Sequence, residues 1–436
     1  MSGRGRGLLL LLAATGCAGG ERAQSLDAPP PVVVSAATAN GATPMFAVAD
    51  DGTKLLSWVA AEGGGSEGVL HLRSEGPRGV ITSSLVDSLG GIEPHGEAPP
   101  VVASGGAGVV YALYTVGKEG EGRFPKSALR FARSDDAGAT WSVPLSVNEG
   151  EAFGSHNFHS LLAGPDGRVY AAWLSNVRGA SAVWLRSSVD GGRTWDAARA
   201  IHEAPTCPCC RTALALDADG TLYAAWRKIF DGNVRDIAVI ASRDGGATWA
   251  EPVKPRDDGW VFDGCPHAGP SMRVGNDGVV HIAWWTGKPG AAGVWYARSA
   301  DHGATWRALP IDTAQQSAPA HVQLALSAGG TVVVGWDDGK SGRPAILLRA
   351  SADGGTGFGP RHTVSDGETA AAYPVLALHG DSLTVAWSAT ADSAYRAMVA
   401  ARPDMKDPNA KMGLPRVGQQ EVVARAMTLR SLTDPR

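Results

Sequence analysis

Apolar runs that end in an aromatic residue recur along this chain every 51 to 59 residues. Typical runs are Val-Tyr-Ala-Ala-Trp and Thr-Val-Val-Val-Gly-Trp, which predict short buried strands. A spacing in the fifties indicates an array of similar units, and seven units are counted in this way. The closing aromatic residues are Trp58, Tyr114, Trp173, Trp226, Trp284, Trp336 and Trp387.

A second pattern keeps the same spacing. The turn Ser-x-Asp-x-Gly-x-Thr-Trp occurs at 134–141, 188–195, 242–249 and 299–306, with a degenerate copy at 351–358. An Asp that accepts backbone N–H groups, followed by Gly with positive φ, stabilises a tight hairpin, and the Trp then packs between neighbouring units. We therefore predict a structural role, not a catalytic one, for the five aspartates Asp136, Asp190, Asp244, Asp301 and Asp353.

These turns resemble the Asp-box, or BNR repeat, of sialidase-like β-propellers, and the resemblance covers residues 44–404. It implies an all-β propeller of four-stranded antiparallel blades. The aromatic-ended strands favour seven blades, and six would result if the seventh unit completed the first. In the fourth unit we expect strands at 212–216, 221–227, 237–242 and 249–253.

Composition narrows the possible partners. The chain has 436 residues and a net charge of -4, with 19% charged residues and no run of Lys and Arg. Nucleic acid and anionic membrane surfaces are therefore not implied as partners. The abundance of glycine and proline, 57 and 27 residues, fits a turn-rich β protein.

The N-terminus indicates export. Arg4 and Arg6 precede the apolar run 8–14, which is too short to span a bilayer as a mature helix. Residues 1–16 resemble a bacterial lipoprotein signal peptide, which implies a lipid on Cys17 and a place in the cell envelope, in the periplasm or at the outer membrane. A secretory signal cleaved nearby is the alternative. Residues 17–43 then form a tether.

The C-terminal tail, 405–436, lies beyond the repeats. Either 31–38 or 421–427 could supply the strand that closes the ring.

The repeats predict two different faces. In an antiparallel meander the A–B and C–D turns share one face, and the B–C and D–A connections share the other. Turns such as Pro165-Asp166-Gly167 are tight, so the longer loops fall on the second face, where binding residues usually lie.

Histidine and cysteine concentrate in the D–A loops. Four cysteines and several histidines precede successive A strands, and a shared channel opening would make them neighbours. The candidate metal ligands are Cys207, Cys209, Cys210, Cys265 and His267, followed by His156, His159 and His321.

Three interpretations of this group stay open. Four cysteines outside the cytoplasm can form two disulfides. Thiolates with imidazoles suit Cu(I) or Zn(II), so copper or zinc is the cofactor that the residues allow. The histidines can also be ordinary loop residues, and a single disulfide can coexist with a histidine-rich site.

The sialidase resemblance has specific consequences. Sialidases of this superfamily hold the substrate carboxylate with three arginines and use a Tyr–Glu pair and an Asp in catalysis. Arg211 resembles one of these arginines, and Tyr373 resembles the nucleophilic tyrosine of the last blade. The arginine motif of the first blade is absent, and no Glu is placed by sequence beside Tyr373. The acids available on loops are Glu97, Asp231, Asp337 and Asp338.

These observations give three functional hypotheses. The first is a binding module that holds a metal ion or small ligand at the Cys/His-rich channel opening. The second is a glycoside hydrolase of the exo-sialidase type, which acts on extracellular glycans through Arg211 and Tyr373. The third is a non-catalytic scaffold of the cell envelope.

Overall fold

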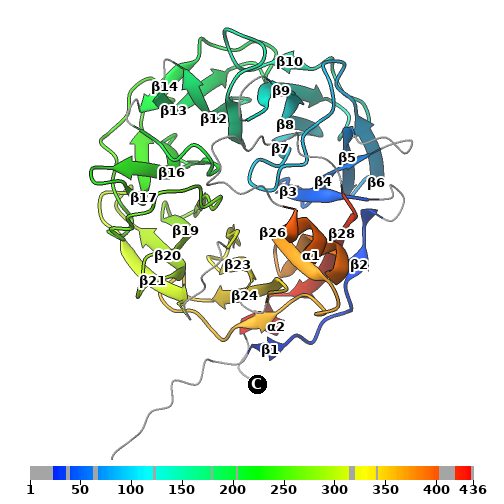
Figure 1. The fold of residues 1–436 in the computed structure, drawn as a ribbon, viewed down its shortest axis with the longest axis vertical. Coiled ribbons are helices and arrows are strands. Elements are labelled where there is room, and N and C mark those ends of the chain that lie inside the picture. Colours follow the sequence, from blue (N-terminus) through cyan, green and yellow to red (C-terminus); the bar gives the residue numbers. More distant parts are fainter. Residues whose placement is uncertain are drawn as a thin grey trace, which may run out of the picture.

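The computed structural model shows seven antiparallel sheets arranged as blades around a central channel (Figure 1). It describes residues 23–35, 40–61, 67–120, 124–177, 180–202, 205–313, 320–339, 342–401 and 418–433. The prediction of a seven-bladed propeller is confirmed, and the six-bladed alternative is wrong because the seventh unit forms a blade of its own. The predicted signal peptide, residues 1–16, and Cys17 lie outside the described residues.

In blades one to five the strands run outward from the channel in sequence order. Blade one contains β3 (Ala42–Val48), β4 (Lys54–Ala61), β5 (Gly68–Gly76) and β6 (Gly79–Leu85). Blade two contains β7 (Val101–Gly106), β8 (Val109–Lys118), β9 (Lys126–Ser134) and β10 (Leu145–Ser146). Blade three contains β11 (His156–Ala163), β12 (Val169–Val177), β13 (Ala180–Ser188) and β14 (Arg199–His202). Blade four contains β15 (Ala213–Leu216), β16 (Leu222–Phe230) and β17 (Val234–Ser242). Blade five contains β18 (Ser271–Val274), β19 (Val280–Thr286), β20 (Gly293–Ser299) and β21 (Arg307–Asp312).

The last two blades also take strands from the N-terminal segment. Blade six contains β22 (Gln323–Leu326), β23 (Val332–Asp338), β24 (Ala345–Ser351), β25 (His362–Thr363) and the parallel outer strand β1 (Gln24–Ser25). Blade seven contains β26 (Ala370–His379), β27 (Ser382–Thr390), β28 (Gln420–Thr428) and β2 (Val32–Val33). In blade four, Val253 forms only an isolated bridge with Val239 in place of a fourth strand.

The aromatic residues of the second strands seal the seams between blades. Alternate residues of a strand point to opposite faces, so a strand between two blades is apolar on both sides. On β8, for example, Tyr114 packs toward blade one, whereas Tyr111 packs toward blade three. Trp173, Trp226, Trp284, Trp336 and Trp387 are among the largest fully buried side chains of the protein.

The Asp-box turns have the structural role that the sequence predicts. Asp136 accepts hydrogen bonds from the backbone N–H of Thr140 at 2.8 Å and from the hydroxyls of Thr140 and Ser134, both at 2.7 Å. The same bonds recur around Asp190, Asp244 and Asp301. The threonine hydroxyl contributes most to holding the pKa of Asp136 at about 2. The turns also tie blades together, because Trp195 packs edge-on against Phe131 of the preceding blade.

Ring closure uses both candidate strands. β28 is the third strand of blade seven, and the N-terminal β2 pairs with it as the outer strand, with Val32 opposite Ala424 and Val33 opposite Val423. A strand from the N-terminal segment and the last strand of the chain therefore lie side by side in blade seven (Figure 1).

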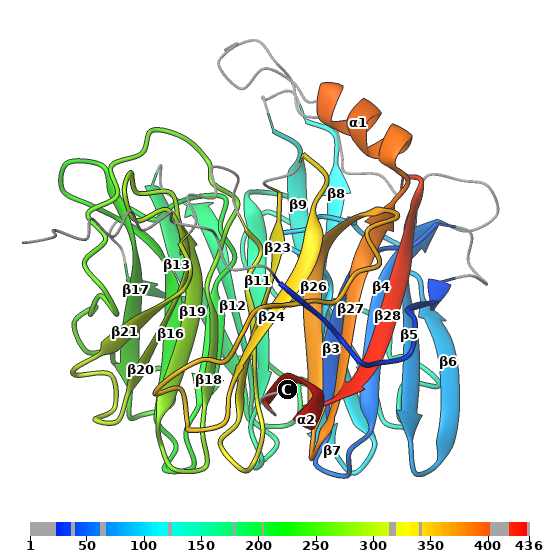
Figure 2. The same ribbon diagram turned by 90° about the horizontal axis from the view of Figure 1, so that it is seen from below.

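Two helices complete the structure. α1 (Asp392–Ala400) follows β27 and stands above the face of the B–C and D–A connections, while α2 (Arg430–Thr433) lies near the opposite face (Figure 2). Within the described residues, neither helix has the length and apolarity needed to cross a membrane.

Arg425 provides a test of ring closure. Its guanidinium donates to the carbonyls of Pro29 at 2.8 Å, Ala28 at 2.9 Å and Val364 at 2.8 Å, which joins the N-terminal segment to blades six and seven. We expect Arg425→Met to lower the free energy of unfolding by about 1–3 kcal/mol, the usual range for hydrogen bonds from a charged group. Urea denaturation measures this change.

Arg430→Met is the matched control, because the Arg430 side chain is 82% exposed and its ion pair with Asp381 spans 4.0 Å. Equal destabilisation by the two substitutions would contradict the role of Arg425.

Candidate functional site

Strained backbone marks the channel end of three innermost strands. Thr43, Phe158 and Tyr373 have φ values of 55°, 56° and 58°, which non-glycine residues rarely adopt. Each lies at an irregularity in the pairing of its blade's first two strands. Bulges of this kind redirect side chains, and such strain is typical of functional sites held by a rigid scaffold.

A group of residues from blades two, four, six and seven meets at this end of the channel. We call it the channel-mouth cluster: Glu97, Arg211, His321, Asp337 and Tyr373.

Asp337 organises one side of the channel-mouth cluster. Its carboxylate accepts the His321 backbone N–H at 2.7 Å and the Tyr373 backbone N–H at 3.0 Å, and lies 2.6 Å from His321 Nδ1. The rings of His321 and Tyr373 pack together with centroids 3.9 Å apart. One carboxylate thus holds the imidazole of His321 and the backbone of Tyr373, which come from adjacent blades.

The charge of Asp337 also controls the protonation of His321. Burial alone would lower the pKa of His321, but the charge of Asp337 and the bond to it outweigh burial and raise the pKa. Glu97 favours the imidazolium and Arg211 opposes it.

Glu97 is buried on the side of the channel-mouth cluster opposite Asp337. Its side chain is 1% exposed, and Oε2 accepts the backbone N–H groups of Gly269 at 3.0 Å and Arg211 at 3.4 Å. The second oxygen, Oε1, makes no hydrogen bond among the described residues and lies 3.9 Å from His321 Nε2. The loop is close enough that a Cβ on Gly96 would lie 2.2 Å from the Tyr373 ring.

The Arg211 guanidinium bonds to neutral groups. The guanidinium donates to the Val322 carbonyl at 3.0 Å and, with the Gln323 amide oriented oxygen-inward, to Gln323 at 3.0 and 3.1 Å. It pairs with no carboxylate of the described chain. Arg273 on β18 is accessible to solvent, yet desolvation by the surrounding protein and then the Arg211 charge lower the pKa of Arg273. The two positive charges together form an environment that attracts an anion.

A small pocket opens among these residues. Arg211, His321, Gln323 and Tyr373 line it together with Thr43, and its enclosed volume is about 10 Å³. This is the size of one water molecule, so a larger ligand would bind over the pocket and not inside it.

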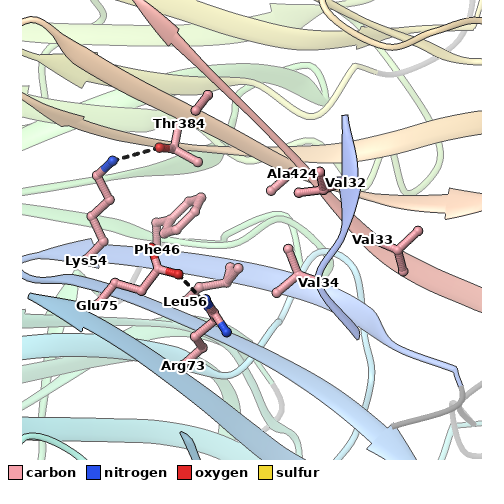
Figure 3. A pocket seen from close by; sticks show the side chains of 11 residues that line it. Val32, Val33, Val34, Phe46, Lys54, Leu56, Arg73, Glu75, Thr384 and Ala424 are labelled. Carbon is pink, nitrogen blue, oxygen red and sulfur yellow. Dashed lines mark hydrogen bonds and ion pairs between the residues drawn. The ribbon is translucent and has the colours of Figure 1, made fainter. Parts of the chain in front are cut away.

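A larger pocket of the described chain lies elsewhere. It lies at the seam between blades seven and one, where β2 passes Phe46 and Ala424, and has a volume of about 350 Å³ (Figure 3). Its walls are mainly apolar, and Lys54 at its edge bonds to Thr384 at 2.9 Å. This pocket is part of the ring closure and holds none of the candidate catalytic groups.

The predicted thiols meet in a second group beside the channel-mouth cluster. Cys207 Sγ lies 3.5 Å from Cys209 Sγ and 3.6 Å from Cys210 Sγ, and all three side chains are buried. Cys209 also belongs to a second set with Cys265 and His267, in which the ligand atoms lie within 4.8 Å of one another. We call these five residues the thiol cluster.

The thiol cluster is electrostatically polarised. Hydrogen bonds from Cys209 and Cys210 lower the pKa of the Cys207 thiol, and the charges of Arg227 and Arg235 act in the same direction. None of the four cysteines forms a disulfide in this structure, so the disulfides considered from the sequence are not confirmed.

The remaining candidates lie outside the thiol cluster. His156 Nδ1 bonds to Ser175 at 3.1 Å, and His159 Nε2 bonds to the Leu113 carbonyl at 3.1 Å. Burial lowers the pKa of His159 to about 4. His321 belongs with Asp337 and Tyr373. Of the loop acids, Glu97 and Asp337 join the channel-mouth cluster, whereas Asp231 is exposed in the β16–β17 turn.

Known proteins resemble this chain over part of its length. Residues 91–258 match the model of the BNR repeat-like domain. A sialidase of Micromonospora viridifaciens is 28% identical over 249 residues, which are 50% of this chain and 38% of that protein. Together with the fold, these matches support a sialidase-like BNR-repeat β-propeller.

Solved structures agree in fold. An ulvan lyase bound to a GlcA–Rha3S glycan aligns with a TM-score of 0.54 and 15% identity, over 85% of this chain and 92% of the lyase. An α-L-arabinofuranosidase of Fusarium graminearum aligns with a TM-score of 0.50 and 12% identity, over 76% of this chain and 98% of that one. At these identities the likeness concerns the fold alone.

The His321–Asp337 pair gives this sialidase-like propeller a pH-dependent stability. A raised histidine pKa stabilises the fold fully below the ordinary value of 6.5, and this contribution is lost as pH rises through the raised pKa. We expect His321→Gln to lower the free energy of unfolding by roughly 1–3 kcal/mol at pH 6 and by less at pH 9. Thermal and urea unfolding at both pH values measure the difference.

The control is His379→Gln, which removes an exposed histidine at the end of β26. A loss of stability by His321→Gln that is equal at pH 6 and pH 9 would show that the imidazolium is not what Asp337 stabilises.

Proposed function

We propose that this propeller binds an acidic glycan over the channel-mouth cluster and cleaves a glycosidic bond there, by hydrolysis as a sialidase does. The proposal rests on one observation above all: Arg211, with no carboxylate partner in the described chain, lines the same pocket as His321 and Tyr373. Similarity to a sialidase over half of the chain supports it. The chain spans only 38% of that relative, so the activity itself is part of the proposal.

The carboxylate of the sugar is assigned to the two arginines. A guanidinium can hold a carboxylate through two parallel hydrogen bonds, and Gln323 fixes the plane of Arg211 from the other side. Arg273 adds a second positive charge, which a bound anion would relieve. An uncharged sugar offers neither benefit, so we infer selectivity for uronic or sialic acids.

Tyr373 and His321 are assigned to the chemistry. Tyr373 resembles the sialidase nucleophile, and the titratable group packed against its ring is His321. A tyrosine nucleophile needs a neighbouring base to take its proton, and the His321–Asp337 pair is suited to this because Asp337 fixes the orientation of the imidazole. Glu97 is a positioning residue, since its carboxylate is buried and accepts backbone N–H groups of Arg211 and Gly269.

The setting of this reaction follows from the sequence alone. The signal-like segment at 1–16 and Cys17 support export to the cell envelope and a lipid anchor, which would place the site where extracellular glycans are available. This localisation stays a proposal.

Turnover of defined substrates tests the function. The purified protein is assayed with a fluorogenic sialoside and, separately, with uronate-containing polysaccharides, whose cleavage by elimination creates an unsaturated sugar that absorbs in the ultraviolet. We expect Arg211→Ala and Tyr373→Phe each to lower kcat/KM by about 100-fold or more, because each removes a group that acts on the transition state.

Arg168→Lys is the control, since this exposed arginine lies on the opposite, Asp-box face. Fluorophore release supports hydrolysis, and ultraviolet absorption without it would replace hydrolysis by a lyase reaction at the same site. No turnover and no binding of either acidic glycan class would refute the proposed function.

A further inference from the structure

Two buried arginines in blade four have no acidic partner. Arg227 is 0% exposed, and its Nη atoms donate only to the carbonyls of Arg235, Ala268 and Trp285. Arg235 is 8% exposed and donates to Cys207 Sγ at 3.4 Å. The Nε atoms of both arginines lack a hydrogen-bond partner, and no described carboxylate lies within ion-pair distance of either.

Buried positive charge requires compensation. The cost of burying an unpaired ion is several kcal/mol, so native proteins pair such groups or neutralise them. Asp258 is held by Arg256 and by Trp284 Nε1 at 3.0 Å, and the buried Asp236 by Lys254 and two backbone N–H groups. The anions that remain available beside the two guanidiniums are thiolates of the thiol cluster.

The sulfur positions suit a shared ion. Two of the S–S distances are 3.5 and 3.6 Å, whereas tetrahedral coordination with Zn–S bonds of about 2.3 Å places sulfurs about 3.8 Å apart. Small movements of the 207–210 turn therefore suffice to bring all three sulfurs to one ion. Cys265 and His267, from the loop before β18 in the next blade, lie on the Cys209 side of this group.

We propose that the thiol cluster binds a thiophilic d¹⁰ metal ion, Zn(II) or Cu(I), through Cys207, Cys209 and Cys210, with the Cys265–His267 pair as the outer ligands beside Cys209. Thiolate and imidazole ligands select these two ions over oxygen-preferring cations. The net charge of the site suits either ion. Three thiolates with Cu(I), or four with Zn(II), leave a charge of about −2, which Arg227 and Arg235 balance.

The site does not depend on the proposed glycan chemistry, because its ligands and its arginines are not assigned to substrate. Its test therefore uses metal content and not turnover.

The first measurement is a joint metal and thiol count. The full chain is exported, purified without chelators and analysed for zinc and copper, and the four thiols are alkylated after denaturation and located by peptide mass spectrometry. We expect one equivalent of metal and four alkylated cysteines. The elemental analysis identifies the bound ion as zinc or as copper. Disulfides among these cysteines with no metal would overturn the proposal.

Variants locate the site. We expect Cys209→Ser to lose the metal and Arg235→Gln to weaken metal binding roughly 10- to 100-fold, as removal of a group that orients a ligand usually does. Co(II) added to the metal-free protein provides a spectroscopic probe of thiolate coordination. If Cys209→Ser fails to fold, Arg235→Gln and chelator titration of the wild type give the same information.

The matched control is His302→Ala, which disrupts the Asp217–Asp219–His302 group near the A–B turn of blade four, where Asp219 and His302 are exposed and Asp217 is buried. Metal content that falls in His302→Ala and is unchanged in Cys209→Ser and Arg235→Gln would place the ion elsewhere and refute the thiol site.

Discussion

The burial of one aromatic residue per blade in the seam with its neighbour is the interaction on which this structure depends. Seven apolar clusters correspond to the seven seams, and each contains the aromatic residue that ends the second strand of one blade. A blade with two apolar faces is not stable alone, because both faces must leave water. The ring therefore has to close. Closure explains why the N-terminal β2 joins blade seven, where Trp387 and Trp58 belong to successive seams.

A closed ring can hold strain that an open structure would release. Thr43, Phe158 and Tyr373 keep left-handed backbone conformations at the channel ends of β3, β11 and β26, each of which is fixed by its blade. Such conformations cost of order 1–3 kcal/mol each and persist only where the surroundings determine them. The Asp-boxes stabilise the outer hairpins on the opposite face, so the face that carries the two clusters is free to vary its loops. The stabilising turns therefore lie on one face of the propeller, and the two clusters lie on the other.

The sequence predicted what local chemistry determines. The aromatic-ended runs gave the second strands, the Asp-boxes gave the hairpins, and antiparallel order placed Cys207 to Cys210, Cys265 and His267 on one face. Contacts between blades were not predictable in the same way. His156 and His159 occupy positions similar to His321, yet their rings turn to Ser175 and to the Leu113 carbonyl of the preceding blade.

The residues that sequence reasoning missed show the same limit. Arg227 continues an ordinary apolar run directly after Trp226, and only the three-dimensional structure shows that its charge is buried without an acid. An arginine at the end of an apolar strand is the one signal that could have drawn attention to it. Glu97 was named among several loop acids, but its burial depends on loops from blades four and five, which no pattern in its own unit describes.

Glu97 also connects the two clusters physically. Its Oε2 accepts the N–H of Arg211, which follows Cys210, and the N–H of Gly269, two residues after His267. Each loop therefore begins at the thiol cluster and ends at the same carboxylate. An ion that fixed the thiols would restrict both loops and hence the position of the Arg211 guanidinium, since the entropy of ordering them would be lost before any ligand arrives. Under the two proposals, the thiol cluster would support the channel mouth by joining the loops of blades four and five beside Arg211.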